Sequence, residues 1–193
     1  MKIIEYPHPT LRHKCKPLQR VDAEIRAVVG EMFERMVEVK GVGLAANQVD
    51  LPYRLFVVAL AEEPDDEPLQ WVFINPVISR PKGTDEAEEG CLSLPGLYAP
   101  VKRPAAITLS AYNLEGEEVN LELDGLFGRI VQHETDHLDG VLFIDRISSA
   151  AEADVRDELL EFEAQFDGRR ATGEIPDDET IARRLAEIEG KFC

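Results

Sequence analysis

Residues 125–140 read GLFGRIVQHETDHLDG, and this stretch predicts a helix at the centre of the fold. Asp124 precedes it at the position of an N-terminal cap, and Gly140 follows it where helices commonly end. Apolar residues and two histidines recur along it at helical spacing, and they form the stripe Leu126, Ile130, His133 and His137. We therefore predict a helix over about 125–138 that turns two imidazole rings toward the core.

The motif HETDH, residues 133–137, is typical of a metal site. Histidines four positions apart lie on one helix face and can bind one ion. Glu134 could accept a proton from water, because a catalytic zinc lowers the pKa of bound water to about 7. Two solvated histidines are the plain alternative, although the whole chain has only four.

A catalytic site of this kind needs a third protein ligand. A third histidine six residues after the motif would stand at the position of Phe143, which cannot bind a metal. Cys91 is the best candidate, because thiolate and imidazole together suit zinc or ferrous iron rather than magnesium or calcium. The weaker candidates lie in the acidic tail or the proline-rich leader and are Glu158, Glu161, His8 and His13.

Cys91 lies in EGCLSLPG, residues 89–96, which we interpret as a turn of small residues. Gly90 lets the backbone come close to a neighbouring element, and the leucines at 92 and 94 bury its flanks. A buried structural cysteine and a cysteine nucleophile activated by histidine are the two alternatives.

The segment GVGLAANQ, residues 41–48, has the Gly-x-Gly start of several nucleotide loops but not their remaining residues. It is small and apolar up to its two amides, which predicts a buried extended segment close to a ligand. The Gln48 amide could donate to a developing oxyanion, or the backbone could satisfy it.

Outside these motifs, the pattern of apolar residues predicts an early helix and then several strands. The helix covers 22–39, and the strands cover 54–60, 69–78, 106–112 and about 119–123. Because the strands cluster without β-α-β alternation, we predict an α+β fold with mainly antiparallel sheets around the HExxH helix. A turn at 113–116 should join the last two strands into a hairpin.

The chain is strongly acidic, with 21 Lys+Arg against 38 Asp+Glu in 193 residues and a formal charge of −17. This charge argues against nucleic-acid and anionic-membrane partners, which need basic surfaces. Three widely spaced cysteines, with no signal-peptide pattern and no apolar stretch of ~18 residues, indicate a cytoplasmic protein.

The last 45 residues contain 13 acidic and 6 basic side chains, and therefore −7 of the charge. Helical patterns on both sides of a loop at 167–176 predict a surface extension with too few apolar residues for a core. We therefore predict a catalytic domain at 1–147 and an acidic helical extension at 148–193.

Together, GVGLAANQ, EGCLS (89–93) and QHETDH (132–137) resemble the three signature motifs of peptide deformylases, in family order. The leader YPHP, residues 6–9, and the stretch 140–145 also resemble the family, so the resemblance covers about 1–147. It implies a metal-dependent hydrolase that removes the formyl group from the N-terminal formyl-methionine of newly made polypeptides and releases formate.

The resemblance also implies a role for each motif residue. One divalent metal ion, with iron(II) native and zinc, nickel or cobalt also accepted, would be bound by Cys91, His133 and His137. Glu134 would act as general base on the attacking water and then as general acid to the departing amine. Gln48 and the backbone N–H of Leu92 would stabilise the tetrahedral oxyanion.

The substrate would be an N-formyl-methionyl nascent peptide. Its methionine side chain should lie near the helix positions one or two turns before the first histidine, Leu126, Arg129 and Ile130. Val42 and Glu89 would form the other wall, Gly43 would offer backbone contact, and Arg103 would pair with Glu89. Some relatives dock on the ribosome through a basic C-terminal helix, which the acidic tail here makes doubtful.

Three other functions stay open at this stage. The chain could be a peptidase that cleaves internal bonds with an acidic third ligand, a non-catalytic protein with a structural zinc, or a Cys-His hydrolase. Formate release, an exchangeable metal site and loss of activity on chelation separate the deformylase from all three.

Overall fold

A computed structural model describes residues 1–61 and 66–193, and the acidic segment AEEPDDEP (61–68) between two predicted strands lies partly outside the described residues. The helices are α1 (Ala23–Glu38), α2 (Gly125–Leu138), α3 (Ser149–Asp154), α4 (Arg156–Ala171) and α5 (Asp178–Phe192), with 3-10 turns η1 (Pro9–Arg12), η2 (Ala46–Val49) and η3 (Phe143–Asp145). The strands are β1 (Gly43–Ala45), β2 (Leu55–Leu60), β3 (Leu69–Lys82), β4 (Asp85–Cys91), β5 (Leu94–Arg103), β6 (Ala106–Tyr112) and β7 (Glu118–Asp124). The predicted α+β class is confirmed.

The larger sheet has the strand order β1-β2-β3-β6-β7, and every neighbouring pair in it is antiparallel. Its second strand, β2, has side chains in two different cores, since Phe56 packs with residues of α2 and Val57 packs with residues of α1. Coverage of both faces explains why 55–60 is a continuous apolar run rather than an alternating one. The predicted hairpin of β6 and β7 is confirmed, with Gly116 at φ +79° in its turn.

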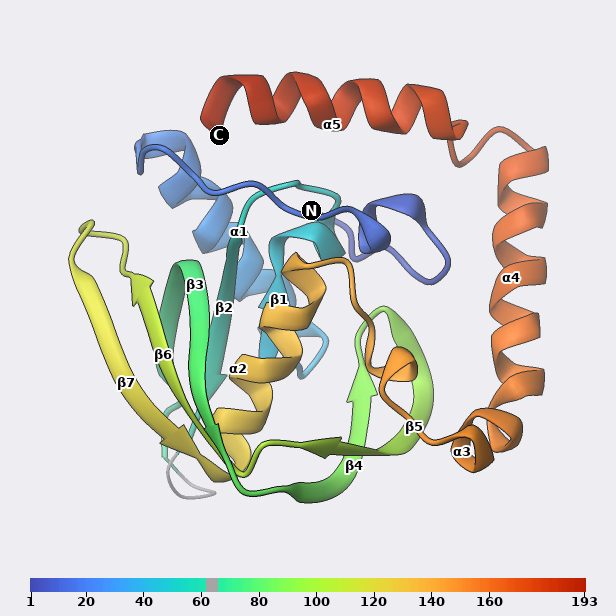
Figure 1. The fold of residues 1–193 in the computed structure, drawn as a ribbon. Coiled ribbons are helices and arrows are strands. Elements are labelled where there is room, and N and C mark those ends of the chain that lie inside the picture. The colour runs from blue at the N-terminus through green and yellow to red at the C-terminus, as the bar shows by residue number, and fades with distance from the viewer. Residues whose placement is uncertain (62–65) are drawn as a thin grey trace.

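Helix α2 crosses the sheet and is enclosed by the rest of the fold (Figure 1). Its predicted stripe is buried at Ile130, His133 and His137, whereas Leu126 is 60% exposed. The stripe therefore runs from the surface into the core. Gly140 ends the helix at φ +74°, and a side chain there would meet the backbone of Arg12.

The two-stranded sheet of β4 and β5 is absent from the sequence prediction. The β4 sequence DEAEEGC has almost no apolar residues, and its acidic side chains are mostly exposed. Its pairing partner β5 alternates buried and exposed positions and covers the core from one side. The prediction failed here because β4 is ordered by backbone pairing with β5, not by an apolar pattern of its own.

The C-terminal helices wrap the outside of the domain and return α5 to the N-terminal segment (Figure 1). The predicted loop at 167–176 is wrong in its first part, because α4 continues to Ala171. The extension also contributes to the core, since Phe192 is buried and lies 5.3 Å from the ring of Tyr53. Glu189 on α5 is buried. Its carboxylate oxygens lie 2.7 Å from Nε2 of His13 and 2.7 Å from Nζ of Lys16.

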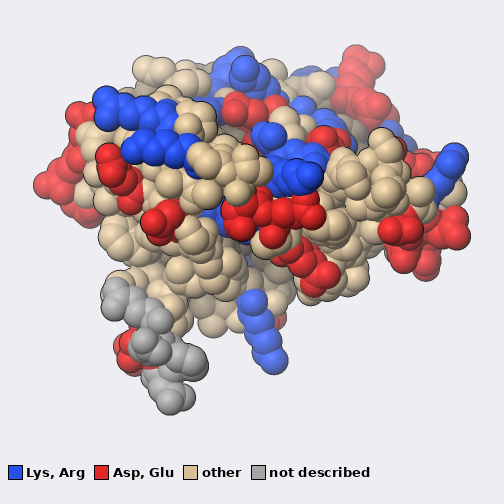
Figure 2. All heavy atoms as spheres, turned by 60° about the horizontal axis from the view of Figure 1, so that its bottom comes forward, with Lys and Arg blue, Asp and Glu red and all other residues tan. Residues whose placement is uncertain are grey.

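Acidic side chains are frequent on the surface of the molecule, as the net charge of −17 leads one to expect. Acidic side chains predominate at the right-hand edge of Figure 2, the side on which α3 and α4 lie in Figure 1. The division into 1–147 and 148–193 stays a prediction. Among the described residues, no helix has both the length and the apolar character that a membrane span requires.

Candidate active site

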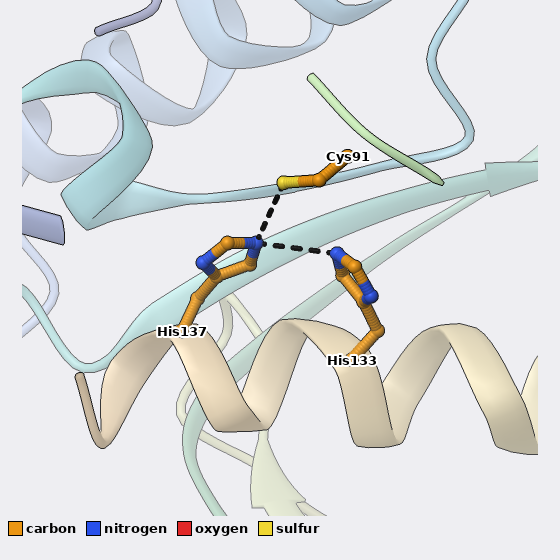
Figure 3. A group of neighbouring side chains, drawn as sticks. All are labelled: Cys91, His133 and His137. Carbon is orange, nitrogen blue, oxygen red and sulfur yellow. Dashed lines mark hydrogen bonds between the residues drawn. The ribbon is translucent and has the colours of Figure 1, made fainter. Parts of the chain in front are cut away.

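The side chains of Cys91, His133 and His137 point toward one another (Figure 3). The thiol comes from the end of β4 and the two imidazoles from successive turns of α2. The Cys91 Sγ atom lies 3.2 Å from His137 Nε2, which lies 3.2 Å from His133 Nε2. Within the described part of the chain, this is the only trio of potential ligand side chains whose donor atoms all lie within 4.8 Å.

The chemistry of this group fits a divalent metal ion. Glu89 accepts a hydrogen bond from Nδ1 of His133, which leaves Nε2 directed at the other two ligands. Burial disfavours a charge on His133, yet its contacts with Cys91 and Glu89 raise its pKa to about 10. Burial and the neighbouring His133 lower the pKa of His137 well below its usual value. The three side chains therefore favour a positive charge placed among the Cys91 thiol and the two imidazoles. A bound metal ion would supply that charge.

Glu134 lies beside this group on α2 and is buried, and its Oε2 atom has no hydrogen-bond partner among the described residues. Burial raises the pKa of its carboxyl group to about 7, although the nearby His133 opposes the shift. A carboxyl group of this pKa can both accept and donate a proton near neutral pH.

Gly43 on β1 makes room for that carboxylate. A Cβ atom on Gly43 would lie 2.5 Å from Oε1 of Glu134. We expect Gly43→Ala to displace Glu134 and to lower kcat/KM by about 10²-fold, because a shift of about 1 Å in a reacting group can cost that much. Steady-state kinetics check this, with Gly30→Ala on α1, where a Cβ meets nothing within 4 Å, as the control. Equal activity of both variants would contradict it.

Glu89 lies behind the metal-ligand group in a buried network of charges. It accepts hydrogen bonds from Arg103 at 2.6 and 2.8 Å, from Arg129 at 2.7 Å and from His133 at 3.0 Å. Burial alone would raise its pKa, but Arg103 and His133 hold the pKa of this carboxyl well below its usual range. The predicted pairing of Glu89 with Arg103 is confirmed. Asp136 extends the network, since it accepts from Arg103 at 2.7 Å.

We expect Glu89→Gln to destabilise the fold by about 3 kcal/mol, because it removes the buried carboxylate that Arg103 and Arg129 share and leaves each with one partner, Asp136 or Asp85. It should also weaken metal binding by about 10- to 100-fold through its effect on His133. Denaturant unfolding and metal titration measure the two effects. Glu86→Gln, on the exposed face of the same strand, should change stability by less than about 0.5 kcal/mol. Wild-type metal affinity in Glu89→Gln would contradict the role of Glu89 in orienting His133.

Gln48 follows β1 in the turn η2 and is buried, so it is not in the extended segment that we predicted. Its Oε1 accepts from the backbone of Ala45 at 2.8 Å, and its Nε2 lies 3.4 Å from Cys91 Sγ and 3.3 Å from Ser93 Oγ. The backbone thus satisfies the amide oxygen and aims the amide nitrogen at the ligand group. Leu92 follows Cys91 in the β4–β5 turn and lines the same pocket.

A pocket of about 640 Å³ opens beside these residues, which lies within the range of small-ligand sites. All the predicted substrate-binding residues line it, namely Val42, Gly43, Glu89, Leu126, Arg129 and Ile130. The guanidinium group of Arg129 is held within the pocket wall, because Glu89 and Asp85 accept hydrogen bonds from it at 2.7 and 2.8 Å. The pocket is also lined by Lys2, Arg35 and Lys40, which no motif contains.

Comparison with known proteins decides the family. The sequence model of polypeptide deformylases matches residues 1–153. The chain belongs to the polypeptide deformylase family. It is 50% identical to a peptide deformylase of Rhodopirellula baltica over 192 residues, which cover 100% of this chain and 95% of that protein. It is 44% identical to that of Neisseria gonorrhoeae, over 82% of this chain and 93% of the relative.

Solved structures of the family agree. Peptide deformylase 1B of Arabidopsis thaliana matches with a TM-score of 0.83 and 38% identity, over 92% of this chain and 97% of that one. The Plasmodium falciparum peptide deformylase matches with a TM-score of 0.82 and 37% identity, over 86% and 98%. Like its family, this metallohydrolase removes the formyl group from N-terminal formyl-methionine, as its motifs implied.

Proposed function

We propose that Cys91, His133 and His137 hold one divalent metal ion in this deformylase and that Glu134 moves the proton during hydrolysis. The observation that supports this most is the meeting of three ligand atoms within 4.8 Å beside a buried, unpartnered carboxylate oxygen. When bound, the metal would polarise the formyl carbonyl and lower the pKa of water at its open position.

The side chains around the ligands perform the other steps. Glu134 removes a proton from the attacking water, holds it on its carboxylate and passes it to the departing amine nitrogen. The amide nitrogen of Gln48 and the backbone N–H of Leu92 donate to the oxygen that becomes negatively charged on the formyl carbon. Because Ala45 fixes the amide oxygen of Gln48, its donor is oriented before the substrate arrives.

The edge of β1 binds the peptide backbone. Val42 C=O accepts from Ala59 N–H at 3.0 Å, so Val42 and Leu44 turn their backbone groups toward β2. In an antiparallel ladder the residue between them faces the other way, and Gly43 therefore offers its N–H and C=O to the pocket. A formyl-methionyl peptide can add to this edge as a further strand.

The methionine side chain lies against α2. Leu126 and Ile130 supply apolar surface from the helix, Val42 supplies it from the opposite wall, and the stem of Arg129 lies between. Glu89 lines the same region with its charge satisfied by arginines, so it does not repel an apolar ligand.

Formate release tests the function. Formyl-Met-Ala-Ser should yield one formate per peptide, whereas a blocked peptide with only internal amide bonds should stay intact. Internal cleavage would favour the peptidase alternative. Against that alternative, Phe143 is buried beside His133, and Glu158 and Glu161 are exposed.

We further propose iron(II) as the native metal of this chain, with zinc, nickel or cobalt as replacements. The Cys-His-His donor set accepts all four. Metal analysis of protein prepared without oxygen should find about one iron per chain, and the activity of that protein should decay in air. Stable activity in air with zinc bound would contradict the iron proposal and leave the deformylase intact.

The proposal places the enzyme in the cytoplasm, on formylated nascent chains, without docking on the ribosome through its tail. The exposed acidic side chains of α3 and α4 would be repelled by ribosomal RNA. Sedimentation with ribosomes at low salt tests this, and a loss of co-sedimentation on truncation after residue 147 would contradict it.

A further inference from the structure

Three cations also line the pocket, Lys2, Arg35 and Lys40, and we call the part of the lining that they form the basic end. Two of them are already paired, because Arg35 contacts Glu38 and Lys2 lies 3.6 Å from Glu174. Lys40 has no carboxylate within 4 Å among the described residues. In a chain with a net charge of −17, an exposed lysine without a carboxylate partner among the described residues thus lines the pocket.

The carboxylates near the basic end do not neutralise Lys40. Glu5 lines the pocket too, but it pairs with Arg169 at 3.6 Å. Glu31, on the exposed side of α1, lies 3.8 Å from the chain N-terminus. Glu88 of β4 also lines the pocket, but the described residues show no ion pair between Glu88 and Lys40.

The backbone conformation of Lys40 also points to a role for its side chain. Lys40 has φ +57°, and the bonds from Lys40 N–H to Val37 C=O and from Gly41 N–H to Met36 C=O end α1 there. The helix ends at Glu38, and the left-handed residue after it is Lys40, one position before Gly41. A left-handed residue at this position is usually glycine, because a side chain costs about 1 kcal/mol or more. The fold tolerates that strain and gains a cation in the lining of the pocket.

The direction of the bound peptide leads to this cation. The formyl group must lie by Gln48 and the metal ligands, beyond the carboxyl end of β1. A peptide that pairs with Gly43 therefore runs antiparallel to β1, past Gly41, toward residue 40. At about 3.3 Å per residue, its second or third residue after the methionine comes within reach of the Lys40 side chain.

We propose that Lys40, supported by Arg35 and Lys2, forms a subsite for acidic side chains at the second or third residue after formyl-methionine. This proposal rests on the proposed function and adds to it a preference for nascent chains with an early aspartate or glutamate. The attraction is that of an exposed ion pair, so it should be modest and should weaken with salt.

The test compares two C-terminally amidated peptides, formyl-Met-Ala-Asp-Ser and formyl-Met-Ala-Lys-Ser, by the ratio of their kcat/KM values. At low salt we expect the holoenzyme to prefer the acidic peptide by about 5- to 10-fold. Lys40→Gly should reduce this ratio toward one, Lys40→Glu should reverse it, and 0.5 M NaCl should reduce it in the wild type.

Two measurements separate a local effect of Lys40 from an effect of lost stability or of overall charge. Lys40→Gly relieves a left-handed lysine, so its Tm should rise by about 2–4 °C while its charge preference disappears. Arg80→Gly is the matched control, since Arg80 is also an exposed cation at positive φ, 50°, but does not line the pocket. It should keep the wild-type ratio.

The outcomes separate the subsite from the proposed function. If neither peptide releases formate, the proposed function is wrong. If both release formate and the ratio is near one, or is the same in Lys40→Glu as in the wild type, the subsite is wrong and the deformylase stands. An equal change in Arg80→Gly would assign the effect to overall charge and also overturn the subsite.

Discussion

Glu134→Gln is expected to lower kcat by about 10²- to 10⁴-fold while the protein keeps one metal ion per chain. The amide has nearly the shape of the carboxylate, so it fits beside Gly43, but it cannot accept the proton of the attacking water. The metal ligands belong to other side chains, and their geometry should not change. Formate release and metal analysis on the same preparation measure both quantities.

The control for this variant is Glu122→Gln, an exposed residue on β7 outside the pocket, which should keep wild-type kcat. The Tm of Glu134→Gln should not fall, because the substitution removes a buried carboxylate whose pKa burial raises to about 7. Unchanged formate release would remove Glu134 from the mechanism. Loss of the metal together with activity would instead make it a structural support for the ligands.

Cys91→Ala is expected to lose both the metal and the activity. Two histidines on one helix leave a divalent ion with half of a tetrahedral shell, and alanine offers no donor in place of the thiolate. Metal content should fall from about one per chain to near zero after dialysis, and formate release should fall to background. The fold should persist, because Cys91 is only partly buried at the end of β4.

Cys193→Ser is the matched control, since Cys193 is equally partly buried but lies at the end of α5, away from the pocket. It should keep full metal content and activity. Full metal content in Cys91→Ala would overturn the ligand assignment. Activity that survives chelation would favour the cysteine-nucleophile alternative.

The sequence alone was sufficient to predict those features of the site that depend on residue spacing or on the needs of a single side chain. The spacing of His133 and His137 on one helix fixed their common direction, and the structure confirms that both rings are buried. Arg103 was also predicted as the partner of Glu89, because a buried carboxylate needs a nearby counter-charge. The sequence did not show that Arg129 and His133 share the same carboxylate.

The sequence predictions failed for segments whose structure depends on contacts with a strand or helix elsewhere in the fold. The acidic strand β4 has no apolar pattern, so only its ladder with β5 shows that Cys91 ends a strand. The tail seemed too polar for a core by composition, yet α5 buries Phe192 against Tyr53 when it returns to the N-terminal segment.

By itself, the sequence determined the family, the metal-ligand residues to be tested and the helix that presents two of them, because motifs and helical period act over a few residues. Only the tertiary structure decided how Cys91 reaches those histidines, which charges surround Glu89, and that Lys2, Arg35 and Lys40 line the same pocket. These contacts join residues far apart in the chain. Such positions are set by packing and strand pairing across the whole fold, which no local pattern specifies.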